Sequence, residues 1–162
     1  MSVAAEVEQR FAAARTDAGL LKAGLFVEEV AALAYAAAAD GPLTGADRAQ
    51  ALRFARHERA HAEVFETMLF ALTVPVREHA TGADLQALMP ALRRAAPQQA
   101  WERLAELEGA AIAGQQLLGR RLQALDALRS VATVMAGGAQ HLVAIRDTLA
   151  DEPVTKAFET GR

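Results

Sequence analysis

The sequence predicts an all-α protein, an antiparallel four-helix bundle with one long crossover connection between its second and third long helices. Hydrophobic residues make up 52 % of the 162 residues; Ala and Leu, which favour helices, are abundant, and β-branched residues are scarce. Apolar residues recur at the helical spacing of three and four positions along nearly the whole chain. We therefore expect a single domain over residues 1–162, with the core bundle at about residues 17–151.

The first half of the chain contains one short and two long predicted helices. The short helix covers about residues 2–15. The first long helix covers about residues 17–39, where an Asp-Gly-Pro turn ends it. The second begins at an N-cap, either Thr44 or Asp47, and continues to about residue 73.

The second half begins with a long connection. Gly and Pro interrupt residues 74–98, so this stretch is predicted to be a connection with a short helix near residues 83–92. The third long helix covers about residues 97–121, and the fourth runs from an N-cap at Asp126 to about residue 151. The tail, residues 154–162, is expected to be loosely attached. A connection of this length can run the length of the bundle, as in bundles with a crossover.

Each long helix has a polar interruption near the middle of its apolar stripe. The inward polar residues are three carboxylates and two imidazoles: Glu28, Glu58, His61, Glu108 and His141. A buried carboxylate without a positive partner costs several kcal/mol or changes its protonation state, and no Lys or Arg lies on these stripes at this level. A bound metal ion is the simplest source of positive charge, so we predict that these five residues are its ligands.

The spacing of these residues is repeated in the two halves of the chain. Glu58 follows Glu28 by 30 positions, and Gly138 follows Glu108 by 30 positions. In each half a His follows three residues later, on the same helix face. Gly138 therefore stands where a Glu would complete a second Glu-x-x-His motif.

Three segments carry a resemblance to a known family. These are Glu28-x6-Tyr35, HERAHAEVFETML at 57–69 and GAQHLVAIR at 138–146. They resemble the ferritin-like superfamily of carboxylate-bridged di-iron proteins, in particular the bacterial ferritin-like domain group, over about residues 17–151. That family uses a Glu from each of two helices and a Glu-x-x-His from each of the other two.

The resemblance implies a ferritin-like bundle and a reduced site of three carboxylates and two imidazoles, because Gly138 replaces one Glu. Iron is the expected metal, with manganese or another divalent ion as alternatives, since carboxylate-rich sites with imidazole suit these metals. An active protein would be an iron-dependent oxidoreductase that oxidises Fe(II) or reduces dioxygen or peroxide. A lone metal, a weak second ion and an empty site all remain open. Gly138 either opens a coordination position or marks a lost site.

Other interpretations also remain open. Glu29 competes with Glu28 for the inward position on its helix. A metal-free ferritin-like scaffold could act through self-association or partner binding. His57-Glu58-x-x-His61 also matches the H-E-x-x-H motif of zinc peptidases, although His57 lies about 100° from the Glu58 face of the helix.

Composition and charge restrict the expected partners. The chain has no Cys, which excludes disulfides, thiol catalysis and iron–sulfur clusters. The net charge is −3 and no Lys/Arg block occurs, so neither nucleic acid nor a membrane surface is an expected partner. No secretory signal or membrane-spanning run is visible, so a cytoplasmic location is expected. Ala-rich faces predict a homo-oligomer, most simply a dimer.

Overall fold

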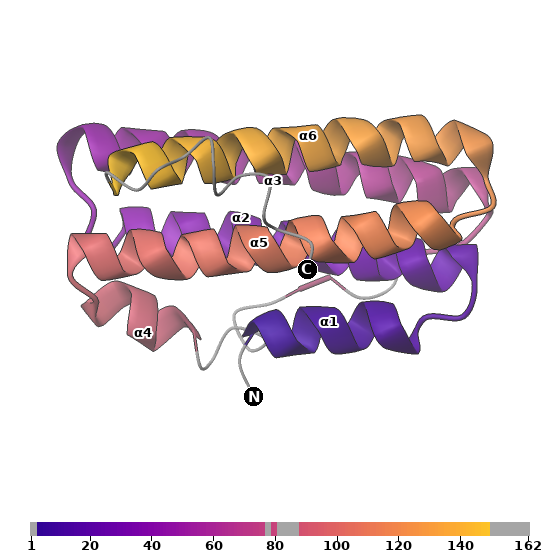
Figure 1. Cartoon of the computed structure of the whole chain (residues 1–162), viewed down its shortest axis with the longest axis horizontal. Helices are drawn as coiled ribbons and strands as arrows, with labels where there is room; N and C mark the ends of the chain where they lie inside the picture. Colours follow the sequence, from indigo (N-terminus) through magenta and orange to yellow (C-terminus); the bar gives the residue numbers. More distant parts are fainter. Residues whose placement is uncertain (1–2, 77–78, 81–87, 150–162) are drawn as a thin grey trace.

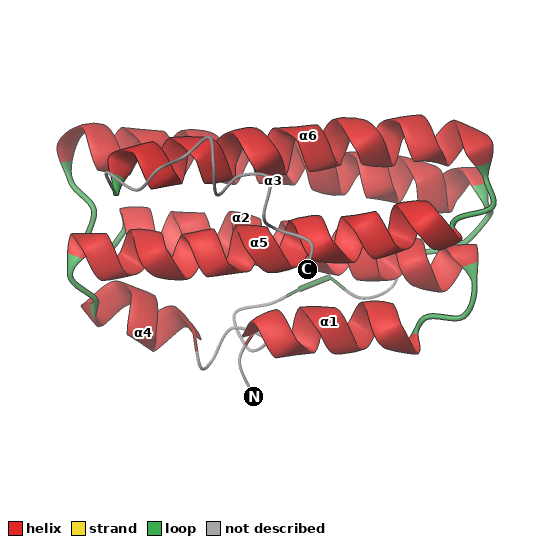
Figure 2. Cartoon of the chain, viewed as in Figure 1, coloured by secondary structure: helices red, strands yellow, loops and turns green. Residues whose placement is uncertain are grey.

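The computed structural model describes residues 3–76, 79–80 and 88–149, and over these residues the chain is a bundle of six α-helices without a strand (Figures 1 and 2). Four long helices form the bundle: α2 (Asp17–Ala39), α3 (Gly45–Ala71), α5 (Pro97–Arg121) and α6 (Leu125–Thr148). Two shorter helices, α1 (Val3–Ala13) and α4 (Leu88–Arg94), cover one side of it. The all-α prediction is confirmed.

The long helices are arranged as two hairpins, α2–α3 and α5–α6. The hairpins meet mainly where α2 packs on α5, and α3 packs on α6 much less extensively. In Figure 1, α3 ends at one end of the bundle and α5 begins at the other, so α3 and α5 run in the same direction. None of the described helices has the length and apolar character needed to cross a bilayer.

Helix α2 lies at the centre of the packing. The helices α1, α3, α4 and α5 all contact it, and residues around its whole circumference are buried. Its sequence is rich in Ala, whose small side chain allows neighbouring helices to approach closely. The side chain of Thr16 accepts a hydrogen bond from the backbone N–H of Gly19 and fixes its start. The predicted limits of this helix, residues 17 and 39, agree with the structure.

The start of α6 differs from the prediction. Asp126 lies inside the first turn, and Ala124 occupies the N-cap position. The carboxylate of Asp17, at the start of α2, instead accepts hydrogen bonds from the backbone N–H groups of Gln123 and Ala124 at 3.2–3.3 Å. A capping group from a distant part of the chain therefore replaces the local one, which is why the sequence pattern misplaced it.

The other limits differ by a few residues. Helix α1 ends at Ala13 rather than at residue 15, and α3 ends at Ala71 rather than at residue 73. Helix α4 covers Leu88–Arg94, whereas the prediction placed a helix near 83–92; of that range, residues 83–87 lie outside the described part of the chain. The end of α6 is Thr148, and the predicted tail at 154–162 also lies outside the described residues.

Candidate metal centre

The five residues predicted as metal ligands come together in the middle of the bundle. They extend from all four long helices: Glu28 from α2, Glu58 and His61 from α3, Glu108 from α5 and His141 from α6. The three carboxylates are each 2 % exposed and His141 is 3 % exposed. The side chain of His61 is 17 % exposed and is the most accessible of the five. The predicted convergence is present, and ligation of a metal remains a prediction.

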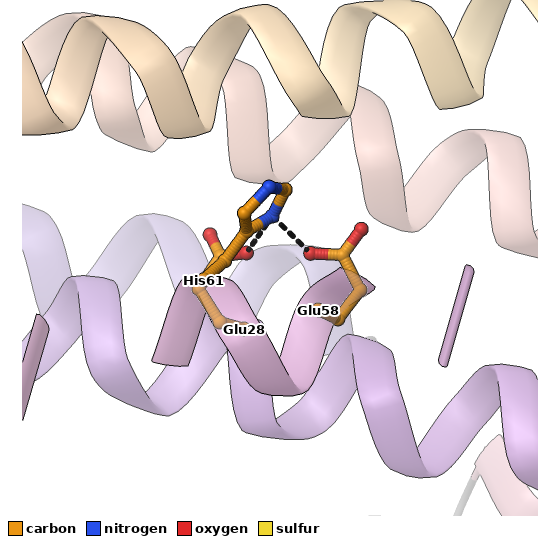
Figure 3. Close-up of side chains that lie close together, drawn as sticks. All are labelled: Glu28, Glu58 and His61. Atoms are coloured by element: carbon orange, nitrogen blue, oxygen red, sulfur yellow. Dashed lines mark hydrogen bonds and ion pairs between the residues drawn. The ribbon is translucent and has the colours of Figure 1, made fainter. Parts of the chain in front are cut away.

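Glu28, Glu58 and His61 form the first group of possible ligands (Figure 3). Nδ1 of His61 lies 2.9 Å from Oε2 of Glu58 and 3.3 Å from Oε2 of Glu28. The side-chain amide of Gln115 donates a hydrogen bond to the other oxygen of Glu28. One imidazole nitrogen therefore faces two carboxylates, one of which is held in place by an amide.

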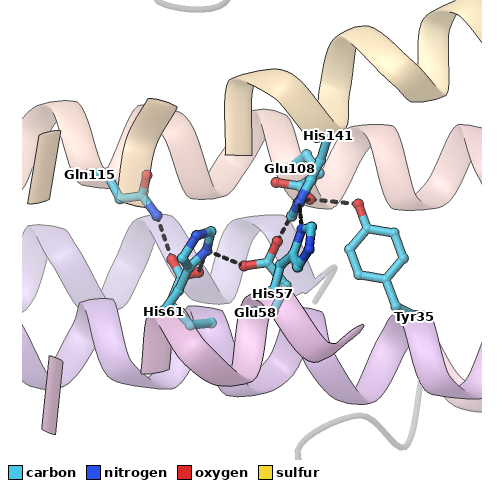
Figure 4. Close-up of polar contacts among 8 residues, drawn as sticks. Tyr35, His57, Glu58, His61, Glu108, Gln115 and His141 are labelled. Carbon is cyan, nitrogen blue, oxygen red and sulfur yellow. Dashed lines mark hydrogen bonds and ion pairs between the residues drawn. The ribbon is translucent and has the colours of Figure 1, made fainter. Parts of the chain in front are cut away.

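Glu58, Glu108 and His141 form the second group (Figure 4). Nδ1 of His141 lies 2.5 Å from Oε1 of Glu58 and 3.1 Å from Oε1 of Glu108. The hydroxyl of Tyr35 donates a hydrogen bond of 2.5 Å to the same oxygen of Glu108. This group repeats the first in composition, because one imidazole nitrogen again faces two carboxylates.

Glu58 belongs to both groups and joins them. Its Oε2 faces His61 and its Oε1 faces His141. Within each group, the possible ligand atoms lie within 4.8 Å of one another, so each group could hold a metal ion. A carboxylate with one oxygen in each group is the arrangement needed to bridge two ions.

The donor groups in the centre do not satisfy its acceptors. A single Nδ1–H of each imidazole cannot make a good hydrogen bond to two carboxylate oxygens at once. Oε1 of Glu58 is buried and has no hydrogen-bond partner among the described residues, although Nδ1 of His141 is only 2.5 Å away. A cation among these atoms would satisfy the oxygens, so the residues fit a metal ion bound by oxygen and nitrogen.

Burial and the paired charges perturb the protonation of the metal-free centre. Burial raises the pKa of Glu28 well above its usual value and that of Glu108 to about 7. Burial acts to raise the pKa of Glu58 as well, but the imidazoles beside both of its oxygens lower it below the usual range. Burial acts to lower the pKa values of His61 and His141, but the facing carboxylates raise them to about 10 and about 9. Without metal, both imidazoles are protonated at neutral pH around an ionised Glu58.

His57 lies beside the centre but in neither group. Its ring is nearly parallel to that of His141, with centroids 5.3 Å apart, and its Nδ1 lies 3.1 Å from Nε2 of His141. Burial and the charge of His141 lower the pKa of His57, so a neutral ring is available to accept a hydrogen bond from His141. None of the groups of possible ligand atoms found among the described residues contains His57, so the pair of His ligands that a zinc peptidase needs is not present there.

The two neighbouring glycines of α6 have different surroundings. A β-carbon at Gly137 would lie 2.6 Å from Cε1 and 2.7 Å from Nε2 of His61, closer than real side chains approach one another. A β-carbon at Gly138 would lie 3.2 Å from Oε2 of Glu108. Gly137 is therefore the residue that allows the ring of His61 to pack on α6. The position at Gly138, where a Glu was expected from the repeat, faces the carboxylate of Glu108.

Glu29, the alternative to Glu28, faces the other way. It contacts the connection after α3, where its oxygens accept from the ring of His79, at 2.5 Å, and from the backbone N–H of Ala80. Glu29, Glu66 and His79 form a third group with possible ligand atoms for a metal ion. The hydrogen bond from His79 to Glu29 raises the pKa of His79, whose side chain is 55 % exposed.

The structure adds three residues to the predicted site. Gln115 and Tyr35 are buried and bind Glu28 and Glu108, and His57 binds His141. Tyr35 follows Glu28 and Gln115 follows Glu108 by seven positions, a spacing that places each on the inward face of its helix, so their burial agrees with the local pattern. Their partners depend on the rotation of α5 against α2, which a helical period does not specify.

No family model matches the sequence, and no match was found among curated proteins or solved structures. The class of the protein is therefore described from its fold and its site alone. It is an all-helical bundle with buried Glu/His clusters that could hold a metal ion.

Proposed function

We propose that the protein is a ferritin-like metal-binding protein whose centre would hold up to two divalent ions, with Glu58 contributing one oxygen to each of its two ligand groups. The observation that carries this proposal is the position of Glu58, which has one carboxylate oxygen in each of two Glu/Glu/His groups. Glu28 and His61 complete one group, and Glu108 and His141 complete the other. Carboxylate oxygens with one imidazole nitrogen per ion favour iron, with manganese as the alternative.

The surrounding residues orient the proposed ligands. Gln115 donates to Glu28, and Tyr35 donates to Glu108, so each terminal carboxylate is held by a neutral donor. His57 contacts Nε2 of His141, which leaves Nδ1 of that ring facing the carboxylates. Partners of this kind fix the tautomer and orientation of metal ligands. Bound iron would supply one-electron redox chemistry toward dioxygen or peroxide.

Metal binding is expected to change the protonation of the centre. Two divalent ions carry four positive charges, and the three carboxylates of the centre supply three negative ones. Ionised Glu28 and Glu108 are favoured only when a cation is present, because burial raises the pKa of both. Metal binding should therefore release protons from the carboxyl groups and from the imidazoles.

The proposal is tested by metal content and its dependence on Glu58. The protein, freed of metal by a chelator, is loaded anaerobically with Fe(II), and bound iron is measured by mass spectrometry. We expect wild type to bind up to two ions per chain and Glu58→Gln to lose most of this capacity. Glu63→Gln, an exposed carboxylate on the same helix, is the matched control. Binding that is absent in wild type, or unchanged in Glu58→Gln, would contradict the proposal.

A metal-free scaffold is the second candidate, and one observation favours it. In the absence of metal, protonated His61 and His141 lie against ionised Glu58, so the centre already contains opposite charges in contact. Such a network would specify the packing of the four helices without a cofactor. The scaffold hypothesis would be favoured if wild type takes up no Fe(II) and has the same unfolding midpoint with and without Fe(II).

A further inference from the structure

The third group of possible metal ligands lies outside the centre and shares no residue with it. Glu29 comes from α2, Glu66 from α3, and His79 from the connection that follows α3. Their side chains are 15 %, 40 % and 55 % exposed, so the group lies at the protein surface. Three separate segments of the chain thus bring one imidazole nitrogen and two carboxylate oxygens within 4.8 Å of one another.

The distances in this group are close to those of a metal site. Nδ1 of His79 lies 2.5 Å from Oε1 of Glu29 and 3.7 Å from Oε1 of Glu66. Zn–N and Zn–O bonds of about 2.0–2.2 Å at tetrahedral angles separate two ligand atoms by about 3.3–3.6 Å. The two measured distances lie on either side of this range. A shift of about 1 Å in the exposed ring of His79 would therefore accommodate an ion.

The two carboxylates have different partners, and the difference leaves room for a cation. The backbone N–H of Ala80 donates a hydrogen bond of 2.6 Å to Oε2 of Glu29, which directs Oε1 toward His79. A donor of this kind orients a metal-ligating carboxylate. The distance from His79 to Glu66 is too long for a hydrogen bond, and the carboxylate of Glu66 accepts none from the described residues. It is therefore free to bind a cation that the imidazole and Glu29 also contact.

The donor set and the space beside it indicate which ions would bind. Imidazole nitrogen together with carboxylate oxygen suits Zn²⁺ and neighbouring transition-metal ions, whereas Mg²⁺ and Ca²⁺ prefer oxygen ligands alone. Glu66 and His79 line an open pocket of about 420 Å³, which has room for water to complete the coordination. No Lys or Arg is present in its lining to compete with a cation; the other lining residues are Thr67, Phe70, Val74, Pro75 and Val76.

We propose that Glu29, Glu66 and His79 bind one divalent transition-metal ion of the zinc type, and that this ion holds the connection at His79 against the α2–α3 hairpin. Two carboxylates and a neutral imidazole carry a charge of −2, which one divalent ion balances. The site is independent of the function proposed for the centre, because its ligands come from another face of α2 and α3 and from the connection.

Zn²⁺ binding is tested in the full-length, metal-free protein. The imidazole ¹⁵N resonances are followed by NMR during titration with Zn²⁺, and a parallel titration uses Mg²⁺. The spectrum of His79→Gln assigns the resonances of His79. Glu66→Gln removes one ligand from a partly exposed position, so it is expected to leave the fold intact. Glu63→Gln is the matched control, because Glu63 is exposed on the same helix and belongs to none of the ligand groups.

We expect Zn²⁺ to shift the Nδ1 resonance of His79 in a saturable way in wild type and Glu63→Gln, and Mg²⁺ to leave it unchanged. In Glu66→Gln the apparent affinity at His79 should fall by about tenfold or more, since removing a residue that only orients a metal ligand already costs about 10–100-fold. An unchanged His79 resonance at millimolar Zn²⁺, or equal affinities in Glu66→Gln and Glu63→Gln, would overturn the site. An equal response to Mg²⁺ would overturn the ion class. Zn²⁺ bound at the centre is distinguished by the resonances of His61 and His141.

Hydrogen exchange at the Ala80 amide tests whether the ion holds the connection in place. This N–H donates to Glu29, so an ion that fixes Glu29 and His79 should slow its exchange severalfold in wild type and Glu63→Gln. At the same Zn²⁺ concentration, exchange in Glu66→Gln should slow much less. Exchange at Ala80 that is unaffected by saturating Zn²⁺ in wild type would overturn this role of the ion.

Discussion

Replacing Gly137 with Ala tests whether the ring of His61 depends on close packing against α6. A β-carbon at this position would lie 2.6 Å from Cε1 of His61, so the ring must move. Movement weakens the contact of its Nδ1 with Glu58 at 2.9 Å and with Glu28 at 3.3 Å. A hydrogen bond to a charged group contributes about 1.5–3 kcal/mol.

The opposing effect is helix propensity. Ala is favoured over Gly in a helix interior by about 1 kcal/mol. Gly109 and Gly119 on α5 are matched controls, because a β-carbon at either position meets nothing within 4 Å. We expect Gly109→Ala and Gly119→Ala to raise the free energy of unfolding by up to about 1 kcal/mol. For Gly137→Ala, the loss at His61 exceeds the gain, so the net change should be a loss of about 0.5–2 kcal/mol.

Urea unfolding followed by circular dichroism measures these differences in the metal-free proteins, and Fe(II) binding is measured in parallel. Gly137→Ala should bind less Fe(II) than wild type, and the two controls should bind the same amount. A Gly137→Ala protein that is stabilised as much as the controls would refute the reasoning. It would show that His61 has space to move without losing its partners.

Three further outcomes are expected. Gly138→Glu should lower the stability of the metal-free protein, because its β-carbon would lie 3.2 Å from Oε2 of Glu108 and its carboxyl would be buried. Fe(II) should raise the melting temperature of this variant more than that of wild type. Equal rises in the two proteins would contradict this prediction. In the metal-free protein, protonated His61 and His141 stabilise the fold fully below pH 6.5, and this stabilisation is lost as the pH rises through about 9 to 10. Burial raises the pKa of Glu108 to about 7, so ionising this carboxyl lowers the free energy of unfolding increasingly as the pH rises above 4.5. Urea unfolding at stepped pH values should therefore show this contribution falling across the range, and a rise would count against the charge assignments. We also propose that the chain forms a dimer, which sedimentation at micromolar concentrations checks; a clean monomer would be evidence against it.

The sequence predicted the long helices and the inward residues well, because both depend on local pattern. The limits of α2 follow from an N-cap at Thr16 and an Asp-Gly-Pro turn, which are local signals. The inward positions of Glu28 and His141 follow from the spacing of apolar neighbours on the same helix. Glu28 was correctly preferred to Glu29, since it shares its face with the buried stripe.

The remaining features depend on contacts between distant parts of the chain. The N–H groups before α6 find their acceptor in Asp17, more than a hundred residues away, so Asp126 was not needed as a cap. The position of Glu58 between the two Glu/Glu/His groups requires the relative height of all four long helices, which the periodicity of each helix leaves open. The sequence also does not show that Gly137, rather than Gly138, lies against the ring of His61, because this depends on the direction in which a β-carbon at each position would point.

The division of the centre between the two hairpins has a consequence for how the site is assembled. Glu28, Glu58 and His61 all lie on the α2–α3 hairpin, within a stretch of the chain that is synthesised first. Glu108 and His141 lie on α5 and α6, and they reach Glu58 only when the second hairpin docks. Contacts close in sequence form earlier than distant ones, since less chain entropy is lost. The first Glu/Glu/His group can thus exist in a half-made bundle, and the arrival of the second hairpin completes the other group and buries the carboxylates of both.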